Sequence, residues 1–217
     1  MPRRLPPADT PLAKPVDSMP VGTLRELKTL AADCRACPLW RKATQTVFGE
    51  GRARAKIMLI GEQPGSQEDI QGRPFVGPAG RLLDKAMEEA GLARNAVYLT
   101  NTVKHFKFEQ RGKARLHQRA NATEQTACRP WLAAELARVR PERVVALGLM
   151  AAQTLFGNAF RMGRDRGQWH TLKHGVQGLA TWHPSAILRL RRAEERDRAF
   201  AELVADLKCT VRREDRH

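Results

Sequence analysis

Long hydrophobic runs are missing from this 217-residue sequence. No apolar stretch approaches the roughly 20 residues that a membrane-spanning helix needs. Residues 1–20 hold arginines and prolines but no apolar signal core. These absences argue against a membrane protein and against export, and we therefore expect a cytoplasmic protein.

Cysteine is also scarce, with four residues at positions 34, 37, 128 and 209. So few cysteines, spread so unevenly, cannot build the disulfide scaffold of a small secreted protein, and the cytosol disfavours disulfides in any case. The close pair Cys34 and Cys37 indicates a metal or redox site instead.

Acidic residues are outnumbered, because 23 Asp and Glu face 38 Lys and Arg and leave a formal charge of +15. This excess is beyond what solubility requires and indicates a polyanionic partner such as nucleic acid. A membrane surface would attract the same charge, but the lack of a spanning segment argues against a membrane partner.

The length of the chain predicts one folded domain. A chain of 217 residues can bury one sizeable core, whereas two full domains would each be small. Residues 1–20 contain six prolines among charged and small residues, which predicts a flexible N-terminal arm. We expect the domain to span residues 21–210 and a basic tail to occupy residues 211–217.

Apolar runs that suit buried strands alternate with segments of helical periodicity. Strands are predicted at residues 55–60, 97–101, 143–147 and 178–182, and helices at 21–32, 78–90, 122–138, 151–156 and from a Ser185 cap to about 208. This alternation predicts a single three-layer α/β/α domain with a central, mainly parallel sheet. In such folds ligands gather at the carboxyl ends of the strands.

Polar residues that suit a binding site lie at those strand ends. Glu62 and Gln63 follow the first strand, Asn101 ends the second and His183 follows the last. Gly61 begins a sharp turn whose glycines would let the backbone approach a ligand. Each feature alone also suits a structural role, as a plain turn, a turn-forming Asn or a His ahead of a helix.

One aromatic residue lies in the loop that comes next. Phe75 is part of the Gly- and Pro-rich segment 72–77, where core packing does not obviously require it. Its ring suits a stacking platform for a base. A small local core around the loop is the alternative.

Four motifs follow one another along the chain: GEQPG from Gly61 with Glu68 and Asp69 downstream, GRPFVGPAGRLLD from Gly72, YLTNTVKH from Tyr98 and HPSAILR from His183. The chain resembles the iron–sulfur uracil-DNA glycosylases of family X, and next those of family 4, in which these motifs stand in this order at the strand ends. The resemblance runs from about Cys34 to Arg189. Four collinear motifs are far more specific than any single one.

That resemblance implies an enzyme that excises uracil from a flipped nucleotide in DNA. Phe75 is then the stacking platform, and the Asn101 amide reads the uracil edge and rejects cytosine. His183 donates a hydrogen bond to the uracil O2, where charge accumulates as the glycosidic bond breaks. The backbone of Gly61 and Gln63 completes the pocket.

Two further residues are implied to act on the sugar. Glu62 stabilises a developing oxocarbenium ion or orients a nucleophile. His117 ends the basic segment Lys113–His117, inside a connection at residues 106–121 that is too long for an idle loop. Family 4 lacks this insertion. In family X a histidine at this position attacks the sugar carbon and ties the protein to the abasic site, although Ala114 departs from that family's basic residue. A solvated loop that touches phosphates is the alternative.

The resemblance also implies a [4Fe–4S] cluster. Cys34, Cys37 and Cys128 are similar to cluster-binding cysteines of these families, and family 4 has a fourth cysteine at the position of His105. We expect His105 to be the fourth ligand here, because imidazole replaces thiolate in some iron–sulfur centres. Cys209 is the alternative ligand. Spacing alone would suit structural zinc equally well.

Further DNA contacts are expected on both sides of this site. Ser185 and the start of the last helix should bind a phosphate, and Ile187 or Leu188 would serve as the wedge that replaces a flipped base. The alternative for both apolar residues is the core. The remaining basic contacts are expected to be Lys113, Arg115 and Arg189.

We therefore expect a monomeric enzyme that excises uracil, preferentially from single-stranded DNA, and becomes covalently attached through His117. One alternative is ordinary turnover of the family 4 type, with water attacking in place of His117. The other is an iron–sulfur protein that binds single-stranded DNA without chemistry.

Overall fold

The computed structural model describes residues 19–211. Apart from residues 19, 20 and 211, the predicted arm and basic tail lie outside this described range. No helix within it is long and apolar enough to span a membrane.

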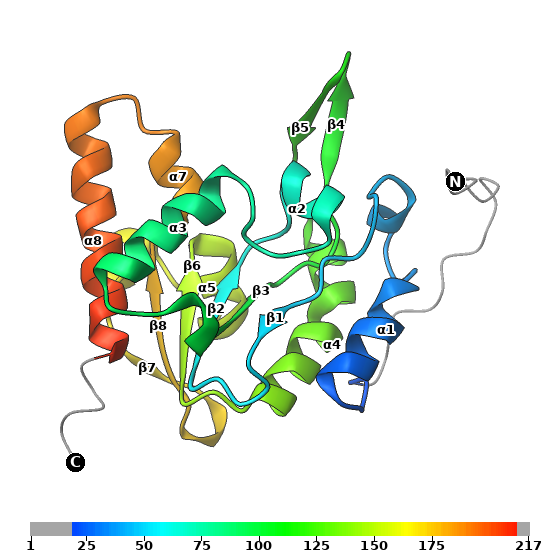
Figure 1. Cartoon of the computed structure of the whole chain (residues 1–217), viewed down its shortest axis with the longest axis horizontal. Helices are drawn as coiled ribbons and strands as arrows, with labels where there is room; N and C mark the ends of the chain where they lie inside the picture. The colour runs from blue at the N-terminus through cyan, green and yellow to red at the C-terminus, as the bar shows by residue number, and fades with distance from the viewer. Residues whose placement is uncertain (1–18, 212–217) are drawn as a thin grey trace.

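A six-stranded sheet forms the centre of the molecule, in the order β1-β3-β2-β6-β8-β7 (Figure 1). Its four inner strands are parallel, and the short strands at the two edges are antiparallel. The strands are β1 (Glu50–Gly51), β2 (Ile57–Gly61), β3 (Val97–Asn101), β6 (Arg143–Leu147), β7 (His170–Thr171) and β8 (Gln177–Thr181). The prediction of a mainly parallel sheet is confirmed.

Helices cover both faces of the sheet because alternate strand residues point to opposite sides. Leu59 and Val145 pack with one helical layer, whereas Ile60 and Val144 pack with the other. The first layer contains α3 (Pro78–Glu89), α7 (Pro184–Leu188) and α8 (Ala193–Val211), and the second contains α1 (Leu24–Ala32), α4 (Ala122–Val139) and α5 (Leu149–Phe156). The structure is therefore the three-layer α/β/α domain that the sequence predicts.

The helix expected from Ser185 to about residue 208 is two helices, α7 and α8, so this prediction was wrong. His183, not Ser185, is the N-cap of α7, and Pro184 occupies the first turn. The chain turns between the helices, and the Arg196 side chain donates hydrogen bonds to the exposed carbonyls of Leu190 and Arg191.

The connection at residues 106–121 contains a separate hairpin, β4 (Phe108–Arg111) and β5 (Ala114–His117), which projects from the sheet edge (Figure 1). Gly112 forms its tip with a φ of 55°, a conformation that favours glycine. Smaller elements complete the described chain: α2 (Ser66–Gln71), α6 (Met162–Asp165), and the 3₁₀ turns η1 (Pro38–Arg41), η2 (Arg94–Ala96) and η3 (Lys173–Gly175).

Strand register brings the predicted site residues together. Gly61 pairs with Asn101 at the carboxyl ends of β2 and β3, and Leu147 pairs with Thr181 at the ends of β6 and β8. Residues that follow these ends therefore meet at one edge of the sheet.

Candidate active site

A cavity of about 550 Å³ opens at the carboxyl ends of the strands. Seven of the residues that line it carry polar or charged groups suited to catalysis or DNA binding: Glu62, Gln63, His117, Arg119, His183, Ser185 and Arg189. A larger hollow of about 750 Å³ lies at the amino ends of β2 and β6, beside Arg54 and Arg140. No predicted site residue lines that hollow, so the smaller cavity is the candidate active site.

Phe75 and Asn101 are buried beside Gly61 next to this cavity. A Cβ atom on Gly61 would lie 2.4 Å from Asn101 Oδ1 and 2.6 Å from Phe75 Cζ, so a side chain at residue 61 would displace both groups. The Phe75 ring centroid is 6.3 Å from that of His183, with the ring planes tilted by 34°. The structure thus brings the predicted aromatic, amide and imidazole groups together.

Phe75 is held in a strained backbone conformation, with a φ of 54°. Arg94 Nη2 donates hydrogen bonds to the carbonyls of Pro74 and Phe75, at 3.0 and 3.2 Å. A Cβ atom on Gly80 would lie 2.0 Å from the Phe75 carbonyl oxygen, so the approach of α3 to this loop requires glycine there. These contacts fix the ring against the strand ends rather than in a separate local core.

Glu62 lies on the wall of the cavity. Its carbonyl accepts hydrogen bonds from Thr102 Oγ1 at 2.6 Å and from the Val103 amide at 3.1 Å, which fix the turn after β2. Burial raises the pKa of the Glu62 carboxyl, and the guanidinium groups of Arg119 and Arg189 oppose that rise. Arg119 Nε lies 3.9 Å from Glu62 Oε1. The cavity therefore holds a carboxylate that is poorly solvated and has cations beside it.

His183 is oriented by the helix that it caps. Its Nδ1 accepts a hydrogen bond from the Ser185 amide at 3.1 Å, and Ser185 Oγ lies 2.8 Å from the same nitrogen. Burial lowers the pKa of His183 to about 4, and Arg189 and His117 lower it further. The ring is consequently neutral near pH 7, and because Nδ1 is an acceptor, the proton resides on Nε2. His183 can thus present an N–H donor to a ligand.

His117 lines the same cavity from the end of β5. Its ring centroid lies 6.0 Å from that of Phe106, which is buried under the hairpin. Although the residue as a whole remains exposed, the protein around it lowers the pKa of His117 by desolvation, with a further contribution from Arg189. A neutral imidazole therefore faces the carboxylate of Glu62 and the ring of His183 across one cavity.

Arg115 was predicted to contact DNA, but the structure uses it to dock the hairpin. Its guanidinium donates to Asp69 Oδ2 at 2.6 Å and to Ser66 Oγ at 2.8 Å. It also lies over the rings of Phe106 and Phe108, at 5.3 and 5.2 Å from their centroids. Arg115 therefore holds the hairpin to α2, and its contact with DNA stays a prediction. Lys113 is exposed at the hairpin tip, as a DNA contact requires.

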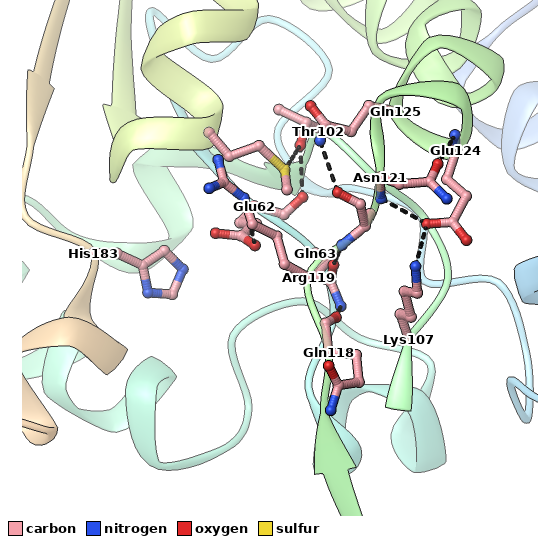
Figure 2. A network of polar contacts seen from close by, with 12 residues as sticks. Glu62, Gln63, Thr102, Lys107, Gln118, Arg119, Asn121, Glu124, Gln125 and His183 are labelled. Atoms are coloured by element: carbon pink, nitrogen blue, oxygen red, sulfur yellow. Dashed lines mark hydrogen bonds and ion pairs between the residues drawn. The ribbon is translucent and has the colours of Figure 1, made fainter. Parts of the chain in front are cut away.

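Gln63 fastens the segment that follows His117 (Figure 2). Its Nε2 donates to the Gln118 carbonyl at 3.0 Å, and its Oε1 accepts from the Ala120 amide at 2.9 Å. The sequence predicted a role in the pocket only for the backbone of Gln63 and did not identify Arg119. The two hydrogen bonds of the Gln63 side chain hold residues 118–120, and Arg119 in this segment lies next to Glu62. A basic residue two positions after His117 was the available signal.

The orientation of α7 distinguishes the two residues that were predicted as candidate wedges. Ile187 is 2% exposed and packs in the core, so its predicted DNA contact was wrong. Leu188 is 47% exposed and remains the candidate. Ser185 and Arg189 both line the cavity, and Arg189 Nη1 donates to Ser185 Oγ at 3.3 Å.

Cys34, Cys37 and Cys128 gather between α1, η1 and α4. Burial raises the pKa of the Cys128 thiol to about 12, and the nearby Cys34 and Cys37 thiols contribute to the rise. Trp131 Nε1 donates to Cys34 Sγ at 3.3 Å. Cys209 is exposed on α8 in the opposite layer, so it is not available as the alternative ligand (Figure 1).

His105 is buried, and its Nε2 lies 2.9 Å from Thr46 Oγ1. Because that hydroxyl donates its proton to the Ala31 carbonyl, His105 donates through Nε2 and leaves Nδ1 for a ligand. Within residues 19–211, no three Cys, His, Asp or Glu side chains are arranged to hold a metal ion as they are placed. The donor set of three thiols and an imidazole nevertheless suits a soft metal centre.

Comparisons with known proteins show to which family the chain is similar. Residues 48–208 match the family model described as "Uracil DNA glycosylase superfamily". The chain is 36% identical to the type-4 uracil-DNA glycosylase of Pyrobaculum aerophilum over 173 residues, 76% of this chain and 85% of that protein. It is 35% identical to the type-4 enzyme of Thermotoga maritima, over 83% of this chain and 91% of that protein. Identity to the type-5 uracil-DNA glycosylase of Mycobacterium tuberculosis is 28%, over 76% of this chain and 73% of that protein.

Proposed function

The chain belongs to the uracil DNA glycosylase superfamily, and from this membership we propose that it excises uracil from DNA in the cavity between Glu62 and His183. The observation that carries the proposal is the hydrogen bond from the Ser185 amide to His183 Nδ1, which leaves the ring to donate through Nε2. Burial lowers the pKa of His183 to about 4, so the ring is neutral near pH 7. A donor of this kind serves a reaction in which negative charge develops on a base.

Recognition would depend on the groups at the strand ends. A flipped uracil stacks on Phe75, and the Asn101 amide pairs with its polar edge. Cytosine presents a different pattern of donors and acceptors along that edge, so an amide fixed for uracil leaves cytosine with unpaired polar groups. The burial of Phe75 and Asn101 supports this reading, because a rigid site discriminates best.

Bond cleavage would place charge on two sides of the glycosidic bond. The bonding electrons leave with uracil, and His183 Nε2–H donates to the O2 atom that receives the charge. Positive charge develops on the sugar, where the Glu62 carboxylate stabilises it. In a hydrolytic reaction water then adds to C1′, and the proton that the water loses neutralises the uracil anion.

Turnover by hydrolysis is the mode that the relatives favour. Five relatives at 34–36% identity are named type-4 uracil-DNA glycosylases. Under this mode the basic hairpin binds DNA phosphates near the cavity, and each protein molecule releases many uracils.

Covalent capture is a second candidate, and the position of His117 favours it. His117 lines the same cavity as Glu62, and its lowered pKa keeps the imidazole neutral and nucleophilic. In this mode the glycosidic bond breaks, uracil leaves as an anion, and one ring nitrogen bonds to C1′ in place of water. The ring then gives up its N–H proton, which neutralises the uracil anion. The closer resemblance to family X remains a prediction on which this mode depends.

We also propose that Cys34, Cys37, Cys128 and His105 bind a [4Fe–4S] cluster. Such a cluster would supply a structural crosslink between α1, α4 and the segment after β3 rather than chemistry on uracil. Purified protein should then be brown, with broad absorption near 400 nm as a rough expectation. Colourless protein with one equivalent of zinc would contradict the cluster.

One experiment separates the candidate functions. The wild-type protein and His117→Ser are each incubated with uracil-containing and matched thymine-containing oligonucleotides, single-stranded and duplex, and run on denaturing gels. Abasic product from the uracil substrate, without a shifted protein band and in molar excess over protein, indicates turnover. A shifted band that His117→Ser loses, while still releasing uracil, indicates capture. Binding without either product would refute excision and leave a DNA-binding protein.

DNA contacts are proposed at Lys113, Arg119, Ser185 and Arg189. Single-stranded DNA is the preferred substrate in this proposal, because a base in a single strand can be flipped without opening a duplex. Leu188, which is 47% exposed on α7, is the candidate wedge for a duplex. The duplex and single-stranded arms of the same experiment test that preference, and size-exclusion chromatography with light scattering tests the expected monomer.

A further inference from the structure

A fully buried ion pair lies directly behind Asn101. The Lys104 side chain is 1% exposed, that of Glu135 is 0% exposed, and Lys104 Nζ lies 2.5 Å from Glu135 Oε2. Removing two charges from water is costly, and replacing such a pair by apolar residues is often neutral or stabilising. Stability alone therefore does not account for this ion pair, and the hydrogen bonds that the two side chains make indicate a further role.

Lys104 uses all three of its ammonium protons. Besides Glu135, Nζ donates to Thr100 Oγ1 at 2.7 Å and to the backbone carbonyl of Asn101 at 2.7 Å. The carbonyl of Asn101 ends β3, at the point where the chain leaves the sheet. Its hydrogen bond to a buried ammonium fixes the orientation of the peptide that carries the Asn101 side chain.

Glu135 holds the ammonium in place from α4. Its Oε1 accepts hydrogen bonds from the Gly49 amide at 2.8 Å and from Tyr98 OH at 3.1 Å, and both of its oxygens accept from Thr100 Oγ1. Because these donors come from the strand β3 and from the segment before β1, the carboxylate cannot shift without disturbing the sheet edge.

The helix α4 contacts the segment after β3 at a second point. The backbone amide of Lys104 donates to Cys128 Sγ at 3.2 Å, and Cys128 lies seven residues before Glu135 on α4, about two turns along the same face. Glu135 thus binds the Lys104 side chain, and Cys128 binds the Lys104 backbone amide.

We infer that Lys104, through its buried hydrogen bond to the Asn101 carbonyl, is a positioning residue for uracil recognition. This inference rests on the proposed uracil excision. Without the ammonium, the Asn101 carbonyl loses a buried partner, and its peptide keeps the hydrogen bond from the Thr102 amide to the Gly61 carbonyl at 2.9 Å. The orientation of that peptide is then less tightly fixed, so the Asn101 amide meets the uracil edge less precisely. Lys104 itself lies behind the site and does not touch the substrate.

The test uses the full chain carrying Lys104→Met together with Glu135→Gln. This pair removes both charges at once, and the glutamine oxygen still accepts from Gly49 and Tyr98, so no buried charge is left unpaired. Arg143→Met is the matched control, because Arg143 is also a buried cation that donates to a carbonyl, that of Thr210, but at the amino end of β6.

We expect kcat for uracil excision to fall by about 100-fold in the double variant, since a misplacement of about 1 Å costs that much. The ratio of uracil to cytosine excision should fall as well, whereas Arg143→Met should keep both values. Thermal unfolding of all three proteins reports stability separately. A double variant with wild-type kcat and wild-type discrimination would overturn the inference, as would equal losses in Arg143→Met. If the wild-type protein releases no uracil, the proposed function fails instead.

Discussion

The hairpin and the group of Phe75, Asn101 and His183 beside the cavity, which we call the floor, are built in different ways. Asn101 ends β3 and His183 follows β8, whereas the loop before α3 places the buried Phe75 ring against Gly61 at the end of β2. His117 stands on a two-stranded hairpin whose attachment depends on a few polar contacts, chiefly those of Arg115 and Gln63. In the proposed function, base recognition would therefore depend on the rigid sheet, whereas any capture of the sugar would depend on the added hairpin.

The largest effect should come from the floor. His183→Ala removes the only donor proposed for the uracil O2, and we expect kcat to fall by about 10²–10³-fold, the usual cost of removing one such donor. His174→Ala, in the η3 turn outside the cavity, is the control and should leave kcat unchanged. Single-turnover excision rates measure both variants, and a loss below threefold in His183→Ala would show that the floor does not stabilise the leaving base.

The pH dependence should also reflect the floor. Because burial raises the pKa of Glu62, its carboxylate is lost as the pH falls through that raised pKa, and activity should fall with it. His183 stays neutral until about pH 4, so its protonation adds to the loss only below that pH. We expect close to a tenfold loss for each pH unit below the Glu62 pKa. Rates measured from pH 4 to 8 should show this slope in the wild-type protein and a flat profile in Glu62→Gln. A wild-type profile that is already flat would remove Glu62 from the reaction.

Loosening the hairpin should have a smaller effect on excision. Arg115→Met removes charge-assisted hydrogen bonds worth about 1.5–3 kcal/mol each, so residues 108–117 should lose protection from hydrogen exchange. Uracil release should stay within about threefold of wild type, because the floor remains intact. Any covalent adduct should decline much more. Lys113→Met, at the exposed tip, should keep the wild-type exchange pattern; equal exchange in both variants would contradict the docking role of Arg115.

The smallest effect is expected at the wedge. Leu188→Ala should lower excision from duplex DNA a few-fold more than from single strands, because only a duplex needs its stack held open. Its stability should change by less than about 0.5 kcal/mol, as is usual for an exposed residue. Ile187→Ala should instead cost about 2–5 kcal/mol of unfolding free energy through a core cavity. Equal loss on both DNA forms in Leu188→Ala would refute the wedge.

The floor could be predicted from the sequence because its signals are local. Continuous apolar runs located the inner strands to within about two residues, and Asn101 and His183 end or follow two of them. Phe75 stood out as the one aromatic residue of a Gly- and Pro-rich loop. The strands of the hairpin could not be predicted in this way. Its strands are mostly exposed and polar, so no buried run predicts them, and Arg115 finds its partner 46 residues away at Asp69.

The sequence by itself determined the α/β/α layers and the meeting of Glu62, Asn101 and His183 at one sheet edge, because strand order and direction follow from apolar periodicity and short connections. Only the tertiary structure decided which of Ile187 and Leu188 faces the core, because the two are neighbours on one helix and the rotation of α7 selects between them. It also decided that Arg115 binds the buried carboxylate of Asp69, and that Lys104 and Glu135 meet behind Asn101. Such pairings depend on distances between segments far apart in the chain, which no local pattern encodes.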